Sequence, residues 1–155
     1  MNSRTQLCLS LFILLPFSVT AQDPLPLPLE EVDDLGELVK KEQAETDNEA
    51  VSVYGGKVGN ADAVFFIEWA GTGSPVEGRY YLPARGKNVL YVLKGTNPRP
   101  GVLELEEYLE QGEGNLVLNA NCKMTKRVAG KRIIWEGEKT YPNGRTLSIS
   151  FSRGQ

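Results

Sequence analysis

The sequence contains no histidine, and it has only two cysteines among its 155 residues. Histidine is the commonest general base near neutral pH and the commonest zinc ligand in proteins. Serine nucleophiles usually depend on such a base, so its absence argues against this type of catalysis. The sequence also has no glycine-rich phosphate loop and no cysteine–histidine metal spacing. We therefore predict a protein that is not an enzyme, with no catalytic residue, no metal site and no cofactor.

Carboxylates are the one remaining source of acid–base chemistry, because two of them suffice to hydrolyse a glycoside. Glu68, Glu136 and Glu138 lie near tryptophans in the sequence, and aromatic rings suit sugars. Acidic residues on exposed strand faces are far more often simply solvated. We therefore keep the prediction of a non-catalytic protein.

The two cysteines do not form an evident pair. Cys8 lies within an apolar run near the start of the sequence, whereas Cys122 is in phase with four apolar neighbours. The second pattern predicts a buried, unreactive thiol. If the first run is cleaved off, Cys122 is left alone and no intramolecular disulfide can form.

Long hydrophobic runs are also lacking. The longest, residues 7–17, is well short of the ~20 apolar residues that a membrane-spanning helix needs. Arg4 precedes this run, and short side chains follow it at Val19 and Ala21, which is typical of a secretory signal peptide. We predict a signal peptide over residues 1–21, cleavage before Gln22, and an exported protein, periplasmic or secreted, with no membrane span after cleavage.

Charge is distributed unevenly along the rest of the chain. Residues 22–51 carry ten acids and two lysines, a net charge of −8, whereas residues 52–155 carry ten acids and fourteen bases, a net charge of +4. We predict an acidic, proline-rich tether over 22–51 and a mildly basic domain over 52–155. The tether could fold back on a basic face, or that face could meet an anionic partner. Export and the modest charge disfavour a nucleic acid as that partner.

The tether contains the one candidate helix. Proline alternates with apolar residues over 23–29, which predicts an extended spacer. Over residues 30–46, apolar side chains recur at spacings of three and four, and acids come before the two lysines, as the helix dipole favours. So short a helix needs a surface to pack on. It either caps the domain or stays partly disordered.

Residues 52–155 alternate short apolar runs with glycine, proline and asparagine, which predicts an all-β domain. We expect an antiparallel up-and-down meander of about eight strands, closing into a small barrel or a lipocalin- or avidin-like sheet. Residues 62–70 form the strongest strand, and Asn143-Gly144 predicts a tight hairpin turn. Residues 51–57 should be short or bulged because of Gly55-Gly56. Residues 88–95, apolar on both faces, should be covered twice.

Three further patterns lie in the second half of the domain. Glu107 interrupts the alternation of its strand, which predicts a bulge or a strand end. Residues 125–130 are predicted to be a basic loop. One face of the preceding strand is expected to be buried; it consists of Leu116, Leu118, Ala120, Cys122 and Met124.

Short sequence motifs between residues 77 and 151 follow one another in a recognisable order. They are Glu77-Gly78-Arg79-Tyr80-Tyr81, Leu93-Lys94-Gly95, Leu103-Glu104-Leu105-Glu106-Glu107, Trp135-Glu136-Gly137 and Pro142-Asn143-Gly144-Arg145-Thr146-Leu147. This order resembles uncharacterised secreted or periplasmic β-meander proteins of bacteria. The resemblance implies a β-meander fold and assigns no catalytic residue.

Binding is the function that the composition favours. Aromatic rings and arginines could hold a small apolar or anionic ligand at a barrel mouth or on an open sheet face. The ligand-binding candidates are Trp69, Tyr80, Tyr81, Arg132 and Trp135. The densest positive patch, a candidate for an anionic partner, consists of Lys123, Lys126, Arg127 and Lys131.

We therefore expect an exported, non-catalytic, barrel-like binding module, a monomer or weak dimer. The alternative is a periplasmic or secreted inhibitor or protein-interaction domain that acts through an exposed loop or sheet face. A ligand carrier should contain an apolar cavity of several hundred Å³. An inhibitor should have a packed interior and an exposed aromatic or basic patch.

Overall fold

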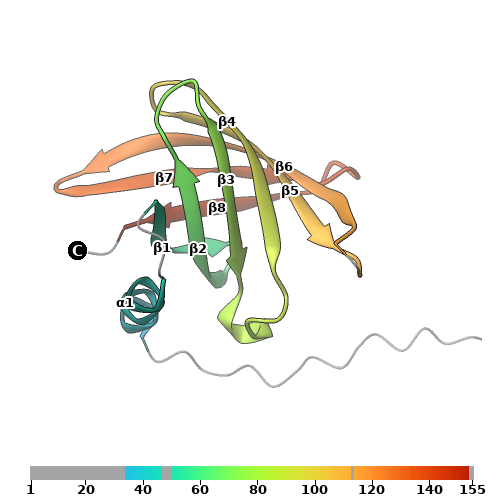
Figure 1. Cartoon of the computed structure of the whole chain (residues 1–155). Helices are drawn as coiled ribbons and strands as arrows, with labels where there is room; N and C mark the ends of the chain where they lie inside the picture. The colour runs from blue at the N-terminus through green and yellow to red at the C-terminus, as the bar shows by residue number, and fades with distance from the viewer. Residues whose placement is uncertain (1–33, 47–49, 113, 154–155) are drawn as a thin grey trace, which may run out of the picture.

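A computed structural model describes residues 34–46, 50–112 and 114–153 (Figure 1). The predicted signal peptide and the extended spacer lie outside these residues. The elements are α1 (Leu35–Glu45), β1 (Val51–Val58), β2 (Ala61–Trp69), β3 (Pro75–Tyr81), the short 3₁₀ helix η1 (Pro83–Arg85), β4 (Tyr91–Arg99), β5 (Val102–Glu110), β6 (Leu116–Ala129), β7 (Arg132–Thr140) and β8 (Thr146–Ser152). No helix in the described part of the chain is long and apolar enough to cross a bilayer.

The eight strands form a closed antiparallel barrel in which each strand pairs with its neighbours in the sequence, and β8 returns to β1. The predicted all-β meander of eight strands is confirmed, and the sheet closes. The hairpin between β7 and β8 turns at Asn143-Gly144, where Gly144 has a φ of 82°. Arg145 accepts, through its carbonyl, a hydrogen bond from the Tyr141 amide that closes this turn.

Side chains fill the barrel interior. The largest that are completely or almost completely buried include Phe65, Tyr80 and Phe151, and their rings lie in contact: the centroids of Phe65 and Tyr80 are 4.8 Å apart, and those of Phe65 and Phe151 are 5.1 Å apart. Leu93, Leu103, Met124 and Ile149 belong to the same cluster. Burial of this many apolar groups is the main stabilising contribution to the fold.

α1 packs on the outside of the barrel, where it covers β1, β2 and β3 (Figure 1). Asp34 caps its first turn by accepting a hydrogen bond from the Gly36 amide at 2.7 Å. Val39 and its helix neighbours pack against Val64, Phe66 and Tyr81, the outward-facing residues of β2 and β3. Of the two outcomes predicted for this segment, capping of the domain is the one observed. The helix itself begins at Leu35 rather than at residue 30.

β1 is neither short nor bulged, contrary to the prediction from Gly55-Gly56. It pairs with β2 residue for residue from Val51 to Val58. The glycines mark close approaches instead. A Cβ atom added at Gly56 would collide with the Ser150 carbonyl oxygen and the backbone of Phe151 on β8, and one at Gly55 would lie 3.2 Å from Val39 on α1.

A β-bulge changes the predicted face of β6. The register between β5 and β6 shifts between Glu107 and Tyr108, which inserts Asn119 as an extra residue. Glu107 therefore marks a bulge, as its break in alternation predicted. Ala120, Cys122 and Met124 are buried as expected, but Leu118 is 42% exposed because the bulge reverses the side-chain phase before it. The expectation for Leu118 was wrong, and Leu116 is only half-buried.

Two other expectations also need correction. The basic segment 125–130 is no loop, because β6 continues through Ala129. Residues 88–95 are not covered on both faces: β4 begins only at Tyr91, Val89 is 40% exposed in the turn before it, and Lys94 faces solvent. Tyr91 and Leu93 are buried in the barrel, whereas Leu90 and Val92 are half-buried on its outside.

Candidate functional site

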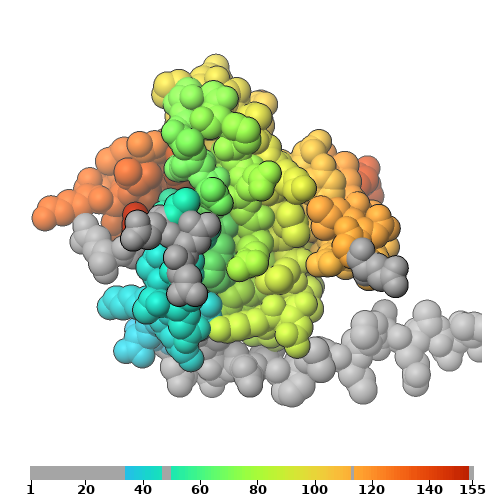
Figure 2. All heavy atoms as spheres, viewed as in Figure 1, coloured from blue at the N-terminus to red at the C-terminus, as the bar shows by residue number. Residues whose placement is uncertain are grey.

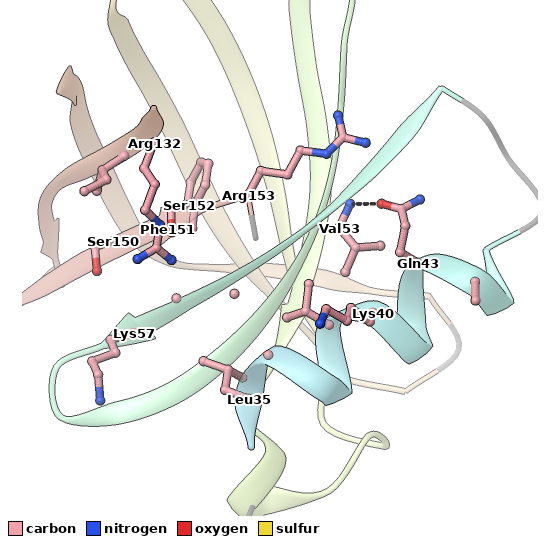
Figure 3. Close-up of a pocket in the computed structure, with 16 residues that line it drawn as sticks. Leu35, Lys40, Gln43, Val53, Lys57, Arg132, Ser150, Phe151, Ser152 and Arg153 are labelled. Atoms are coloured by element: carbon pink, nitrogen blue, oxygen red, sulfur yellow. Dashed lines mark hydrogen bonds between the residues drawn. The ribbon is translucent and has the colours of Figure 1, made fainter. Parts of the chain in front are cut away.

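A groove of about 780 Å³ runs along the outside of the barrel, between α1 on one side and the ends of β7 and β8 on the other (Figure 3). Its floor is β1. The residues that line it come from α1, β1, β7 and β8, together with Arg153 just beyond β8: Leu35, Gly36, Val39, Lys40, Gln43, Ala44, Val53, Gly55, Gly56, Lys57, Arg132, Ile134, Ser150, Phe151, Ser152 and Arg153.

The groove exists because β1 and β8, whose pairing forms the seam that closes the barrel, are paired over only a short stretch. β1 pairs with β8 only from Gly55–Ser152 to Val58–Ile149, so residues 51–54 have no partner residue on β8. The side chain of Gln43 on α1 takes that place, and its Oε1 accepts a hydrogen bond from the Val53 amide at 2.9 Å (Figure 3). Gly55 and Gly56 have no side chains to fill the space. A shallow apolar channel therefore follows the seam.

Every charged side chain that lines the groove in the described part of the chain is positive. Among its lining residues there are four cations and no acid. Lys57 forms an ion pair with Asp62 at 2.9 Å and points away from the middle of the groove (Figure 3). Lys40, Arg132 and Arg153 have no carboxylate within ion-pair distance among the described residues. These three cations are therefore available to an anion from outside the domain.

The five predicted ligand-binding residues do not come together. Trp69 and Trp135 meet inside the barrel, with ring centroids 5.1 Å apart in an edge-to-face contact. Tyr80 is buried nearer the opposite end of the interior, and Tyr81, its neighbour in sequence, faces outward beneath α1. Only Arg132 lines the groove. The aromatic candidates are thus core residues, and the arginine is the one that faces a possible ligand.

The predicted anionic-partner patch lies along the hairpin of β6 and β7. Arg127 donates from Nε to Glu136 at 2.7 Å, and this contact raises the pKa of Arg127 and lowers that of Glu136. Lys123 lies 3.6 Å from Glu104. Lys126 and Lys131 have no such partner among the described residues. The patch is therefore partly neutralised on the barrel wall and is strongest at the hairpin tip.

A second group of functional interest, which the sequence did not indicate, lies inside the barrel. Lys139 and Glu107 are 2% and 0% exposed, and Lys139 Nζ donates to Glu107 Oε1 at 2.6 Å. Tyr80 donates to the other carboxylate oxygen at 2.7 Å, and Asn119 donates from the bulge at 2.6 Å. Tyr91 lies beside the lysine, with its ring centroid 5.3 Å from Nζ. Both oxygens of the carboxylate therefore accept from protein donors.

Burial raises the pKa of two side chains in this part of the interior, Tyr80 and Cys122. Burial, followed by the charge of Glu107, raises the pKa of Tyr80 far above its ordinary value. Burial also raises the pKa of the Cys122 thiol to about 12. A neutral buried thiol is a poor nucleophile, in line with the prediction that Cys122 is inert. In the described part of the chain, no three His, Cys, Asp or Glu side chains are placed to hold a metal ion.

Another hollow, of about 730 Å³, lies on the far side of α1, over β2, β3 and β4. Its rim carries the acids Glu42, Glu45, Glu68 and Glu77, and Arg79 lies among them over the ring of Phe66 at 5.3 Å. Tyr81 and Lys87 both donate to Glu42 there. These contacts tie α1 to the barrel, so we assign this hollow a structural role.

Both hollows lie outside the barrel, whereas the interior is filled. A packed interior with exposed cations at the β6–β7 tip is the combination expected of an inhibitor. The apolar space expected of a ligand carrier lies outside the barrel, in the groove. The groove could have been suspected from Gly55-Gly56 beside a lysine-bearing helix. The sequence offered no signal that these elements would meet Arg132 and Arg153.

Comparison of the chain with protein-family models, curated proteins and solved structures gives no match.

Proposed function

We propose that this protein is a non-catalytic binding module that holds a single-chain amphiphile with an anionic head in the groove between α1 and the β1–β8 seam. The observation that carries the proposal is the pairing of an apolar floor with three unneutralised cations. The half-buried side chains of Leu35 and Ile134 and the bare backbone of Gly55-Gly56 give the groove its apolar surface. Lys40, Arg132 and Arg153 line the same groove. A purely apolar ligand would leave the cations without a function.

The size and chemistry of the groove suit such a ligand. Pockets for small molecules measure roughly 300–1,000 Å³, so a groove of about 780 Å³ can take one alkyl chain with its head group. Arginine and lysine are the usual partners of carboxylate and phosphate. The hydroxyls of Ser150 and Ser152 on β8 add two neutral donors. A phosphate or carboxylate head satisfies this set.

The absence of histidine and the burial of Cys122 support a binding role over catalysis. The export expected from residues 1–21 would expose the groove to ligands outside the cytoplasm. N-terminal sequencing of the protein purified from its host tests this part of the proposal, and an intact Met1 would contradict it.

Titration of the purified protein with dodecyl phosphate, below its micelle concentration, tests the ligand class. We expect one molecule to bind per chain by isothermal calorimetry. Inorganic phosphate tests the head alone, and dodecyltrimethylammonium tests the chain with the opposite charge. Both should bind at least tenfold more weakly, because each lacks one of the two interactions.

Substitution locates the ligand. The double change of Lys40→Gln and Arg153→Gln should weaken dodecyl phosphate binding by at least tenfold. Lys94→Gln is the matched control, because Lys94 is an exposed lysine on β4, away from the groove, and it should leave the affinity unchanged. Equal binding of the cationic and anionic amphiphiles would overturn the proposal.

Native mass spectrometry of the protein from its own host separates the two functional classes. A retained small molecule of a few hundred daltons supports the binding module. A retained protein subunit would instead favour the inhibitor or protein-interaction alternative.

A further inference from the structure

The hairpin between β6 and β7 extends beyond the barrel. β5 pairs with β6 only as far as Thr125, and β8 pairs with β7 only as far as Ile134. Beyond these points, residues 127–129 pair only with residues 132–134 of the same hairpin, and the Lys126 amide makes the last bond to the barrel by donating to the Gly101 carbonyl at 2.8 Å. A two-stranded ribbon therefore projects from one end of the barrel, on the left of Figure 1, and its atoms stand clear of the body of the molecule in Figure 2.

The tip of this ribbon is both apolar and cationic. Val128 and Ile133 are opposite each other in the register, and they are 65% and 45% exposed. Val128 is the most exposed of the large hydrophobic residues in the described part of the chain. Over residues 126–133 the sequence has four bases and no acid. Of these bases, only Arg127 has a carboxylate partner among the described residues, and that partner is Glu136.

We propose that this hairpin tip docks the protein on anionic membrane surfaces. Val128 and Ile133 enter the layer of lipid head groups, and Lys126 and Lys131 bind the lipid phosphates around them. Apolar side chains flanked by lysine and arginine are the combination that holds soluble proteins at a bilayer interface. The proposal goes beyond ligand binding in the groove and does not require it.

The shape of the tip favours a membrane over a protein partner. A specific protein interface covers roughly 800 Å² on each side. A protruding hairpin tip, residues 127–133, offers far less continuous surface. Two aliphatic side chains at a protruding tip can instead enter a fluid lipid surface, which adapts its shape to them. The cations supply long-range attraction to that surface, which falls off with increasing salt.

Co-sedimentation of the full chain with vesicles tests the proposal. We expect binding to vesicles of mixed phosphatidylglycerol and phosphatidylcholine and at least tenfold weaker binding to phosphatidylcholine alone. Added salt should weaken the first interaction. Equal binding to both vesicle types, or no binding to either, would overturn the proposal.

Substitutions assign the binding to the tip. Lys126→Gln with Lys131→Gln should weaken binding to the anionic vesicles about 30-fold. Val128→Asp should weaken it by at least tenfold, because it places a negative charge where an apolar group enters the surface. Leu118→Asp is the matched control, since Leu118 is an exposed apolar residue at the other end of β6. A variant of Val128 that binds like the parent protein, or a loss of binding in Leu118→Asp, would contradict the assignment.

Two measurements keep the result interpretable. The circular dichroism melting curve of each variant should match that of the parent protein, because the tip makes no core contact. The groove variant with Lys40→Gln and Arg153→Gln should keep its vesicle binding. Loss of vesicle binding in the groove variant would overturn docking through the tip. Calorimetric titration with dodecyl phosphate tests ligand binding in the groove separately.

Discussion

Lys139 and Glu107 place two opposite charges inside an otherwise apolar barrel. Each is almost fully buried, and the pair is tied to Tyr80 and to Asn119 of the β6 bulge. Desolvation of two ions is costly, so a buried pair contributes little net stability compared with an apolar replacement. The pair favours one register of the strands over any shifted one. A slip by one residue would turn one of the two charges to the outer face and leave the other buried without its partner.

Lys139→Met should lower the free energy of unfolding by about 3–5 kcal/mol, because it leaves the Glu107 carboxylate buried without its cation. Adding Glu107→Gln should recover most of this loss, since the amide oxygen can still accept from Tyr80 or Asn119. Urea unfolding of the single and double variants measures both effects. Equal stability of the two variants would show that the charges are not coupled.

At the scale of elements, the β1–β8 seam depends on glycine. Gly56 lies where β8 crosses close to β1, and an added methyl group would collide with backbone atoms that cannot move aside. The groove and the closure of the barrel both depend on this position. The neighbouring Gly55 faces α1, where a methyl group would meet flexible side-chain atoms of Val39 and Leu35.

Gly56→Ala should therefore destabilise the protein by about 3 kcal/mol, through forced separation of β1 and β8. Gly55→Ala is the matched control in the same strand. It should change the stability by less than about 1 kcal/mol, because the extended backbone accepts alanine and the unfolded chain loses entropy. Thermal unfolding of both variants provides the comparison. A similar melting temperature for the two would refute the close-approach explanation.

The elements that could be predicted are those whose signal is local. The strand at residues 62–70, the Asn143-Gly144 turn and the interruption at Glu107 each depend on a few adjacent residues, and the structure confirms them. Leu118 was misplaced because the extra residue of the bulge, Asn119, lies on β6, opposite Glu107 and Tyr108. Nothing in the sequence of β6 itself marks that position. The groove was missed because Lys40, Arg132 and Arg153 come to line one groove only after the barrel closes and α1 packs on β1.

At the scale of the whole molecule, several buried acidic groups respond together to alkali. Burial raises the pKa of Tyr80 and Tyr81 above their ordinary values, with hydrogen bonding to Glu42 as a further cause for Tyr81, and it raises that of Cys122 to about 12. Each group keeps its proton in the folded state at a pH where the unfolded chain loses it. Alkali therefore pulls the equilibrium toward the unfolded chain.

Stability should be fully retained below about pH 8.5 and should fall steadily as the pH rises above the ordinary pKa values of cysteine and tyrosine, about 8.5 and 10. Urea midpoints measured from neutral pH to strong alkali test this. Tyr81→Phe is expected to be less stable at neutral pH, because it loses the hydrogen bond to Glu42, but to show a shallower decline in alkali. A midpoint that stays constant or rises above pH 9 would contradict the prediction.

The seam has a consequence for how the protein is made. β1 and β8 are the first and last strands of the ring, and only four residue pairs join them. Nearly a hundred residues separate these partners, so their contact has the largest loop-closure entropy in the barrel. The ring cannot close until β8 has left the ribosome, and the chain before that moment is an open sheet with two free edges. Pairing of β8 with β7 and β1 is therefore the last strand pairing that becomes available to the growing barrel.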